Sequence, residues 1–146
     1  MGHPVQDRAA EAQDAVASQG DSRSYSIADL AGHFGLTMRA LRFYEEKDLL
    51  RPVRRNSRRI YLQRDFDILT DIVRMKAIGM TIAEIRSIID LVRSGQVANG
   101  EKLAVKIASK REKEIEKQIK TLREASLEAT GLIDAIESRV GWFKTS

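Results

Sequence analysis

Apolar residues recur at helical spacing along most of the chain after residue 25, and this pattern predicts a mainly α-helical fold. In the first amphipathic stretch, four apolar residues fall on one helical face, namely Ile27, Leu30, Ala31 and Phe34. Ser26 is expected to cap its start, with Asp29 as the acidic partner three residues later. Gly35 is suited to end this helix, and Thr37 is expected to cap a second helix over about residues 38–47. Two helices joined by so short a turn must cross steeply, which is helix-turn-helix geometry.

A short hairpin is predicted after the second helix. Pro52 stops further helix, and residues 53–61 fit two strands joined at Asn56-Ser57. Asn tolerates the positive φ that a tight turn needs, and Ser is acceptable there although poorer than Gly. Five arginines lie between residues 51 and 61, namely Arg51, Arg54, Arg55, Arg58 and Arg59. The hairpin therefore has the density of positive charge expected of a DNA-contacting wing.

Two further helices are predicted to complete a domain over residues 24–93. The third runs over about residues 63–78, and the fourth begins at Thr81, which forms a capping-box pattern with Glu84. The polar stretch 94–100 is expected to be a linker. Residues 1–23 lack a large apolar stripe, so we expect a disordered tail there.

One long charged helix is predicted over residues 101–140, followed by a short C-terminal tail, 141–146. Its apolar residues alternate at spacings of three and four, a heptad seam interrupted by Glu112 and Ser126. The seam residues expected to mediate dimerisation are Val105, Ala108, Ile115, Ile119, Leu122, Ala129, Ile133 and Ile136. A single helix cannot bury such a stripe alone, so a second copy of the chain is the expected partner. The alternative is a helix that folds back on its own domain.

The positive charge is concentrated in one part of the chain. The net charge is +4, and the segment from Thr37 to Arg64 holds nine basic and three acidic residues, which gives 9 − 3 = +6. The rest of the 146-residue chain is therefore slightly acidic. Basic residues focused on a turn, a helix and a hairpin favour double-stranded DNA as a partner over an ordinary solvated charged face.

Composition disfavours several other classes of function. There is no cysteine, which excludes disulfides and thiolate ligation, and only His3 and His33 could supply imidazole. We therefore expect no metal site and no cofactor. No residues form a paired base and nucleophile or a phosphate loop, so an enzyme is not expected. Without an apolar run of about 18 residues or a signal peptide, the chain is expected to be cytoplasmic and nucleoid-associated, with no membrane partner.

The second helix supplies the candidate base-reading residue. In a helix-turn-helix, the N-terminal residues of this helix lie in the major groove, which places Thr37 and Arg39 nearest the base edges. Arg39 is the best candidate, because bidentate contact of Arg with guanine is the commonest specific contact. Arg42 and the Tyr44 hydroxyl are expected to bind phosphates. The alternatives are a salt bridge from Arg42 to a glutamate of the same helix, and a Tyr44 that only fills the core.

A family resemblance rests on many spaced positions. The string S-I-x-D-L-A…G-L-T-x-R-x-L-R-F-Y-E-x-x-x-L-L-x-P-x-R…N-x-x-R-x-Y, continued by K-A-I-G-M-T-I-A-E-I, resembles the DNA-binding domain of the MerR family of bacterial transcription regulators. It covers residues 25–92. The resemblance implies a winged helix-turn-helix followed by a dimerisation helix that pairs antiparallel with its partner. It also implies DNA contacts for residues on the recognition helix, on the wing and near a second wing, namely Arg39, Arg42, Tyr44, Arg54, Arg59, Tyr61 and Lys76.

The wing departs from the family pattern. The family usually turns on Asn-Gly-Tyr, whereas this chain has Asn56-Ser57-Arg58. We expect Arg55 and Arg58 to make this wing rely more on charge, and hence to make DNA binding more sensitive to salt. Phe43 stands where the family often has Tyr, which removes one hydroxyl contact.

The resemblance implies a transcription regulator that binds a pseudo-palindromic promoter site as a homodimer. Such a dimer would distort the promoter spacer so that RNA polymerase engages both promoter elements. Members of the resembled family that sense metals or redox state do so through cysteines, and members that sense drugs carry a large C-terminal ligand domain. This sequence shows neither feature. We therefore expect the activity of the regulator to be controlled by its amount or by a protein partner, and not by a small-molecule effector. The alternatives are an architectural DNA-bending or recombination-accessory protein of the same fold, and an adaptor that acts through its coiled coil.

Overall fold

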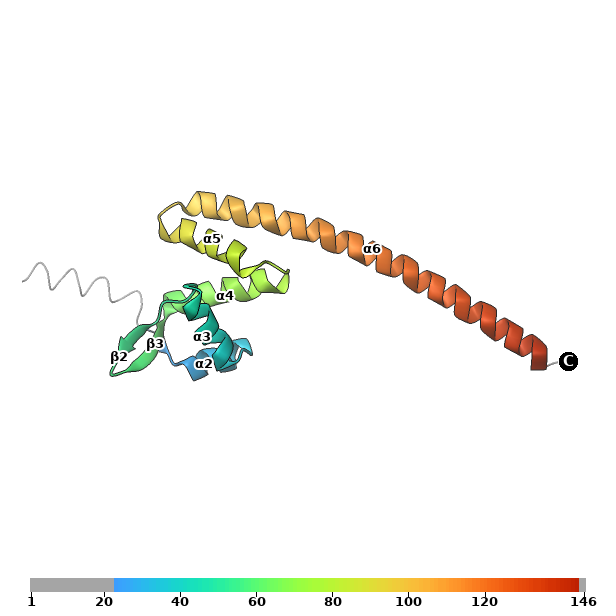
Figure 1. The fold of residues 1–146 in the computed structure, drawn as a ribbon, viewed down its shortest axis with the longest axis horizontal. Coiled ribbons are helices and arrows are strands. Elements are labelled where there is room, and N and C mark those ends of the chain that lie inside the picture. The colour runs from blue at the N-terminus through green and yellow to red at the C-terminus, as the bar shows by residue number, and fades with distance from the viewer. Residues whose placement is uncertain (1–22, 145–146) are drawn as a thin grey trace, which may run out of the picture. The chain divides into compact units, whose positions relative to one another are not determined.

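The described chain folds into the predicted helices and hairpin strands in the predicted order, plus one unexpected strand. This computed structural model describes residues 23–144, with side chains through residue 139 (Figure 1). The elements are β1 (Ser24–Tyr25), α2 (Ile27–Phe34), α3 (Met38–Glu46), β2 (Val53–Arg55), β3 (Arg58–Leu62), α4 (Gln63–Ala77), α5 (Ile82–Arg93) and α6 (Val97–Lys144). The described residues divide into two compact units, of which the first ends at Lys102 and the second begins at Leu103. The mainly α-helical class is confirmed, whereas the predicted tail lies almost wholly outside the described residues.

Local capping chemistry sets the helix-turn-helix as predicted. The Ser26 hydroxyl accepts from the Asp29 amide, and the Asp29 carboxylate accepts in return from the Ser26 amide. Gly35 ends α2 in the left-handed conformation, with φ of 63°. Thr37 caps α3 by accepting from the Ala40 amide at 3.0 Å. These three caps define both ends of α2 and the start of α3, and so the sharp turn between the two helices.

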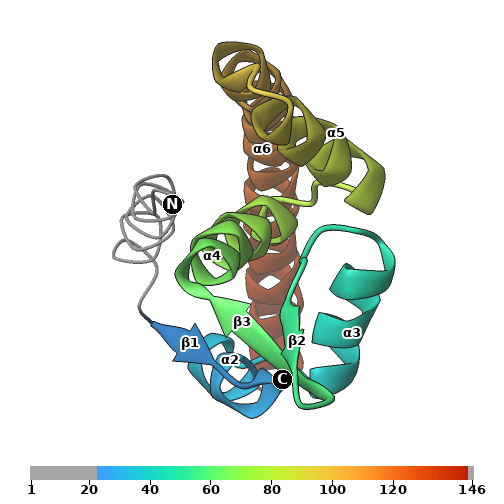
Figure 2. The ribbon, with the colours of Figure 1, turned by 90° about the vertical axis from the view of Figure 1, so that its left-hand side faces the viewer.

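The hairpin turns where the sequence predicts. Asn56 and Ser57 both have positive φ, 50° and 63°, as a tight two-residue hairpin turn requires. Strand β3 lies in the centre of a three-stranded antiparallel sheet, with β2 on one side and β1 on the other (Figure 2). Strand β1 is not predicted by the sequence pattern, and it pairs Tyr25 with Tyr61. This extra pairing anchors the base of the wing to the start of α2.

The first unit has one small core built from all its helices and from β3. Its fully buried side chains are Leu30, Leu41, Leu49, Leu50, Tyr61, Leu69, Ile72 and Ile85. Asp65 is buried with them at the start of α4, where its carboxylate accepts from the amides of Leu62 at 2.9 Å and Arg51 at 3.4 Å. One carboxylate thus connects both ends of the hairpin to α4, which satisfies amides that would otherwise be buried without a partner.

The linker predicted over residues 94–100 is longer than the one in the structure. Gly95 ends α5 with φ of 84°, and α6 already begins at Val97, four residues before the expected start at residue 101. Gly100 lies within the first turns of α6, and a Cβ there would meet the Val92 side chain at 2.8 Å. Gly100 is therefore a position of close packing between two helices, and the polar composition of this stretch disguised a helix start.

The second unit is the remainder of α6. Its apolar stripe is exposed to solvent, with Leu122 69% exposed. The side chains of Trp142 and Phe143 lie outside the described part. Across residues 23–144, no helix is both long and apolar enough to cross a membrane.

Candidate nucleic-acid interface

Two exposed arginines project from α3. Neither the Arg39 nor the Arg42 side chain forms a hydrogen bond or ion pair with another residue in the described part of the chain. The expected alternative, a salt bridge from Arg42 to a glutamate on its own helix, is therefore not formed. Glu45 cannot supply it because its carboxylate is bound to two residues of β3. Both guanidinium groups on α3 can thus bind an external anion or base edge.

Three more arginines are exposed on the hairpin. Arg55 and Arg58 face each other across the strand pair, and Arg54 lies opposite Arg59 in the same register. The side chains of Arg54, Arg55 and Arg58 form no hydrogen bond or ion pair within residues 23–139. A narrow ribbon with this many unpaired cations repels itself, so binding a polyanion would relieve that repulsion.

The remaining two predicted wing contacts, Arg59 and Tyr61, have a structural role within the chain. The burial of Tyr61 contradicts its predicted DNA contact, whereas a contact by the partly exposed Arg59 stays a prediction. Tyr61 is fully buried, and its hydroxyl donates a hydrogen bond to Glu45. Arg59 donates from Nε to the other Glu45 oxygen at 2.8 Å, and the two side chains are 31% and 15% exposed. Burial and the bond to Glu45 raise the pKa of Tyr61, and the Glu45 carboxylate raises the pKa of Arg59. We call these three residues the brace, because they fasten β3 to α3.

Two other predicted DNA contacts, Tyr44 and Thr37, make contacts within the protein. Tyr44 is only 8% exposed, and burial raises its pKa. Its ring therefore fills the core, while its hydroxyl makes no hydrogen bond to another described residue, so a phosphate contact by the hydroxyl stays a prediction. The Thr37 hydroxyl accepts from the Ala40 amide, so its capping role is clear and a DNA contact stays a prediction. Lys76 is exposed in the last turn of α4, as a phosphate contact would require.

A second set of contacts, which the sequence pattern did not predict, holds the chain just after α3. Arg93, at the end of α5, donates from Nη1 to the Asp48 carbonyl at 2.5 Å and from Nη2 to the Leu49 carbonyl at 2.9 Å. Burial lowers the pKa of Arg93. Arg51 binds the Asp48 carboxylate through two hydrogen bonds of 2.8 Å, which holds the pKa of Asp48 at about 2. Helix α3 is therefore secured at its C-terminal end as well as by the brace.

Exposed apolar side chains on α3 were also missed. Met38 and Phe43 are exposed beside the two arginines, and the Lys47 ammonium lies 5.6 Å from the centroid of the Phe43 ring. Such side chains can contact thymine methyl groups in a major groove. The exposure of Phe43 was only weakly indicated by the sequence. Phe43 and Tyr44 are adjacent on one helix, so only one of the two rings could be expected to face the core. No group of three potential metal ligands lies close together among the described residues.

Comparison with known proteins agrees with this geometry. The family model described as "MerR HTH family regulatory protein" matches residues 25–91, and the one described as "MerR, DNA binding" matches residues 67–129. Together they span both the winged unit and much of α6. The chain belongs to the MerR family.

Curated relatives include the HTH-type transcriptional regulator CueR from several bacteria. The CueR proteins of Salmonella typhi and Yersinia pestis are 37% and 38% identical over 68 residues, which is 45% of this chain and 49% of each relative. CueR of Escherichia coli O157:H7 is 36% identical over 73 residues, 49% of this chain and 54% of that protein. The chain spans about half the length of the curated relatives it matches.

A solved MerR-family structure has the same fold. It is the crystal structure of HiNmlR, a MerR family regulator lacking the sensor domain, bound to promoter DNA. The likeness has a TM-score of 0.58 at 22% sequence identity, and it covers 70% of this chain and 77% of that chain. At this identity the match supports the arrangement of elements, and the roles of individual side chains rest on the geometry described above.

Proposed function

We propose that this protein is a sequence-specific DNA-binding transcription regulator that acts as a homodimer on a pseudo-palindromic promoter site. The observation that carries the proposal is the set of five exposed arginines without partners in the described chain, divided between α3 and the hairpin as Arg39, Arg42, Arg54, Arg55 and Arg58. A helix and an adjoining ribbon that both present guanidinium groups suit a major groove and its flanking backbone.

In this proposal the arginines have different roles in DNA binding. Arg39, near the N-terminus of α3, reads a base edge, and Arg42 with the Tyr44 hydroxyl binds phosphates. Arg54, Arg55 and Arg58 bind the backbone beside the groove, and Lys76 adds a phosphate contact from α4. The brace and Arg93 hold α3 and the hairpin at fixed positions, so the cations meet DNA already oriented.

The exposed stripe on α6 supports the homodimer, because apolar side chains at heptad spacing are stabilised by burial against a second helix. Two recognition helices joined in this way would bind two half-sites. We further propose that the dimer distorts the spacer of its promoter so that RNA polymerase can engage it, and that the protein acts in the cytoplasm at the nucleoid without catalysing a reaction. A known MerR-family regulator bound to promoter DNA is a supporting analogy.

Genome-wide mapping of bound sites, followed by footprinting at the strongest sites, tests the proposal. Protection across the spacer between two polymerase recognition elements is the expected result. Protection at many loosely related sites would instead favour an architectural DNA-bending protein. Absence of DNA binding at ~100 mM salt, where phosphate contacts still contribute strongly, would leave an adaptor acting through α6.

A further inference from the structure

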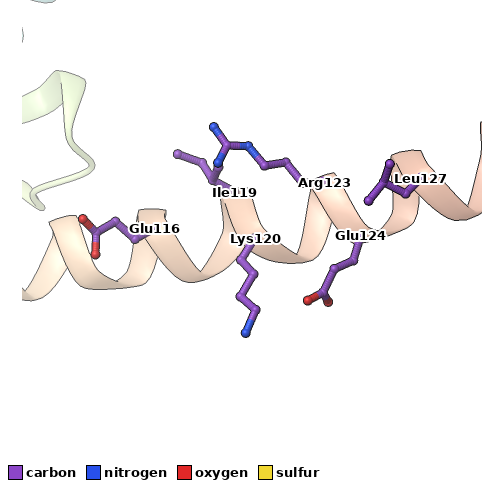
Figure 3. Close-up of a pocket in the computed structure, with 6 residues that line it drawn as sticks. All are labelled: Glu116, Ile119, Lys120, Arg123, Glu124 and Leu127. Atoms are coloured by element: carbon purple, nitrogen blue, oxygen red, sulfur yellow. The ribbon is translucent and has the colours of Figure 1, made fainter.

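Large exposed apolar side chains lie mainly on two helices of the described chain. Most are on α6, where Ile119 and Leu127 line a shallow hollow and extend outwards from the helix (Figure 3). The homodimer proposed above accounts for the stripe on that helix. Two others, Met38 and Phe43, are on α3, and the contacts proposed so far with phosphates and guanine do not use them.

The core of the first unit leaves Met38 and Phe43 outside. Met38 is 43% exposed and Phe43 is 38% exposed, whereas the core takes Leu41 and Tyr44 from the same helix. An apolar side chain that stays in water gives up the free energy that its burial would release. An apolar pair on the exposed face of a helix that would enter a DNA groove therefore points to an apolar group on the DNA.

Helix geometry places each of these two side chains next to an arginine. Residues four apart are neighbours on a helix surface, so Met38 lies beside Arg42, and Arg39 lies beside Phe43. Met38 is also the first residue of α3, at the end that contacts base edges in this motif. Met38 and Phe43 are five residues apart, about 7.5 Å along the helix axis, so they would meet different base pairs.

The ring of Phe43 has neighbours that restrict its orientation. The Lys47 ammonium lies 5.6 Å from the centroid of the Phe43 ring, and the Tyr44 ring centroid lies 6.0 Å away with its plane inclined at 53°. A cation over the ring and a core aromatic beside it both favour one ring position. Phe43 therefore offers a defined apolar surface, whereas the unbranched Met38 side chain can adjust to its target.

Only one of the four standard bases has an apolar group in the major groove. This base is thymine, through its C5-methyl group, and cytosine presents the same group when it is methylated at C5. We propose that Met38 and Phe43 each contact the C5-methyl group of a pyrimidine in the half-site, supplied by thymine or by 5-methylcytosine. This inference rests on the proposed function. It adds to that function a base preference that no hydrogen bond supplies.

Replacement of thymine by uracil tests the inference on the unmodified full chain, because uracil pairs in the same way and lacks only the methyl group. The probes are duplexes that carry the site selected by the protein, with one thymine replaced at a time, and fluorescence anisotropy gives each dissociation constant. Loss of one methyl contact should weaken binding about fourfold, the equivalent of about 0.8 kcal/mol for one buried methyl group. The same replacement in both half-sites should weaken binding about fifteenfold, because a dimer makes the contact twice. Uracil outside the half-sites should have no effect.

Substitutions in α3 assign the contact to its side chains. Met38→Ala should abolish the difference of about fourfold between thymine and uracil at one position, and Phe43→Ala should abolish it at another. Met38→Leu keeps an apolar side chain of similar volume and should retain the difference. Arg42→Ala is the matched control on the same helix, since it should weaken both duplexes alike and leave their ratio unchanged. Each ratio is measured within one variant, so a general loss of affinity or stability does not alter it.

A second pair of probes distinguishes the two sources of the methyl group. Cytosine is placed at a position that is sensitive to uracil, once without and once with a methyl group at C5. The methylated duplex should bind about fourfold more tightly. Equal affinity of these two duplexes would overturn the contact with 5-methylcytosine and leave thymine as the source.

The remaining outcomes separate this inference from the proposed function. Specific binding with equal affinity for thymine and uracil at every position would overturn the inference and leave the proposed function standing. A uracil effect that neither Met38→Ala nor Phe43→Ala abolishes would also overturn it, because another group would then contact the methyl. Selection of no DNA motif by the full chain would overturn the proposed function, and this inference with it.

Discussion

The brace between α3 and the hairpin makes a quantitative prediction. Tyr61→Phe keeps the buried ring but removes the hydroxyl that donates to Glu45. A hydrogen bond to a charged acceptor contributes about 1.5–3 kcal/mol, so we expect a loss near the lower end, about 1.5 kcal/mol, because Arg59 still binds the same carboxylate. Glu45→Ala should cost more, about 2–4 kcal/mol, because it leaves the buried hydroxyl without an acceptor and removes a partly buried ion pair.

Urea unfolding of the two single variants and the double variant measures the coupling between these residues. Once the hydroxyl is gone, Glu45→Ala no longer leaves it unsatisfied, so the double variant should be more stable than the sum of the single effects predicts by about 1–2 kcal/mol. Thr70→Val, which removes a hydroxyl bonded only within α4, is a control and should show no coupling to Glu45. Additive effects of Tyr61→Phe and Glu45→Ala would refute the brace as an energetic connection between α3 and the hairpin.

Four other substitutions test separate parts of this interpretation. Arg39→Ala should cost about 1–3 kcal/mol of specific binding and relax preference at one base position, measured by competition among altered sites. Arg58→Ala should weaken specific and non-specific binding alike and reduce the salt slope by about one, whereas an effect on one sequence only would contradict a backbone contact. Arg93→Met should lower the free energy of unfolding by about 1.5–3 kcal/mol, because two carbonyls lose a charged donor. Asp48→Asn should remove stability that is present above pH ~4 and lost as pH falls towards about 2, because the folded pKa is depressed; urea unfolding across that range checks it.

Local features of this protein could be predicted from sequence because neighbouring residues determine them. Ser26, Gly35 and Thr37 cap helices through contacts within about five residues, and the turn at Asn56-Ser57 depends on its own dihedral preferences. The heptad spacing on α6 is equally local. Each of these features appears in the structure where the pattern predicts it.

Features that depend on distant contacts could not be predicted. In the sequence, Arg59 looks like the exposed arginines of the hairpin, because it has the same charge and lies among them. Only its ion pair with Glu45, fourteen residues earlier, shows that it has a structural role. Strand β1 is two residues long and exists because β3 is available to pair with it. Arg93 reaches carbonyls 44 and 45 residues away. The start of α6 was hidden because glycine at 100 suggests a linker, whereas its role is close packing against Val92.

The division of arginines has a consequence for how DNA would be recognised. Two of the seven in the basic segment from Arg39 to Arg59 form ion pairs with Glu45 or Asp48. These two, Arg51 and Arg59, contribute to positioning, and under the proposed function the exposed arginines remain for DNA. The salt dependence of binding should therefore reflect fewer phosphate contacts than the raw charge of the segment suggests.

Selection of bound duplexes from a randomised DNA pool by the full chain tests the central claim most directly. We expect an inverted repeat, with two half-sites at a fixed separation and one position in each that depends on Arg39. We also expect two chains bound to each selected duplex. Enrichment of no motif, or of a single half-site bound by one chain, would contradict a dimeric, sequence-reading regulator.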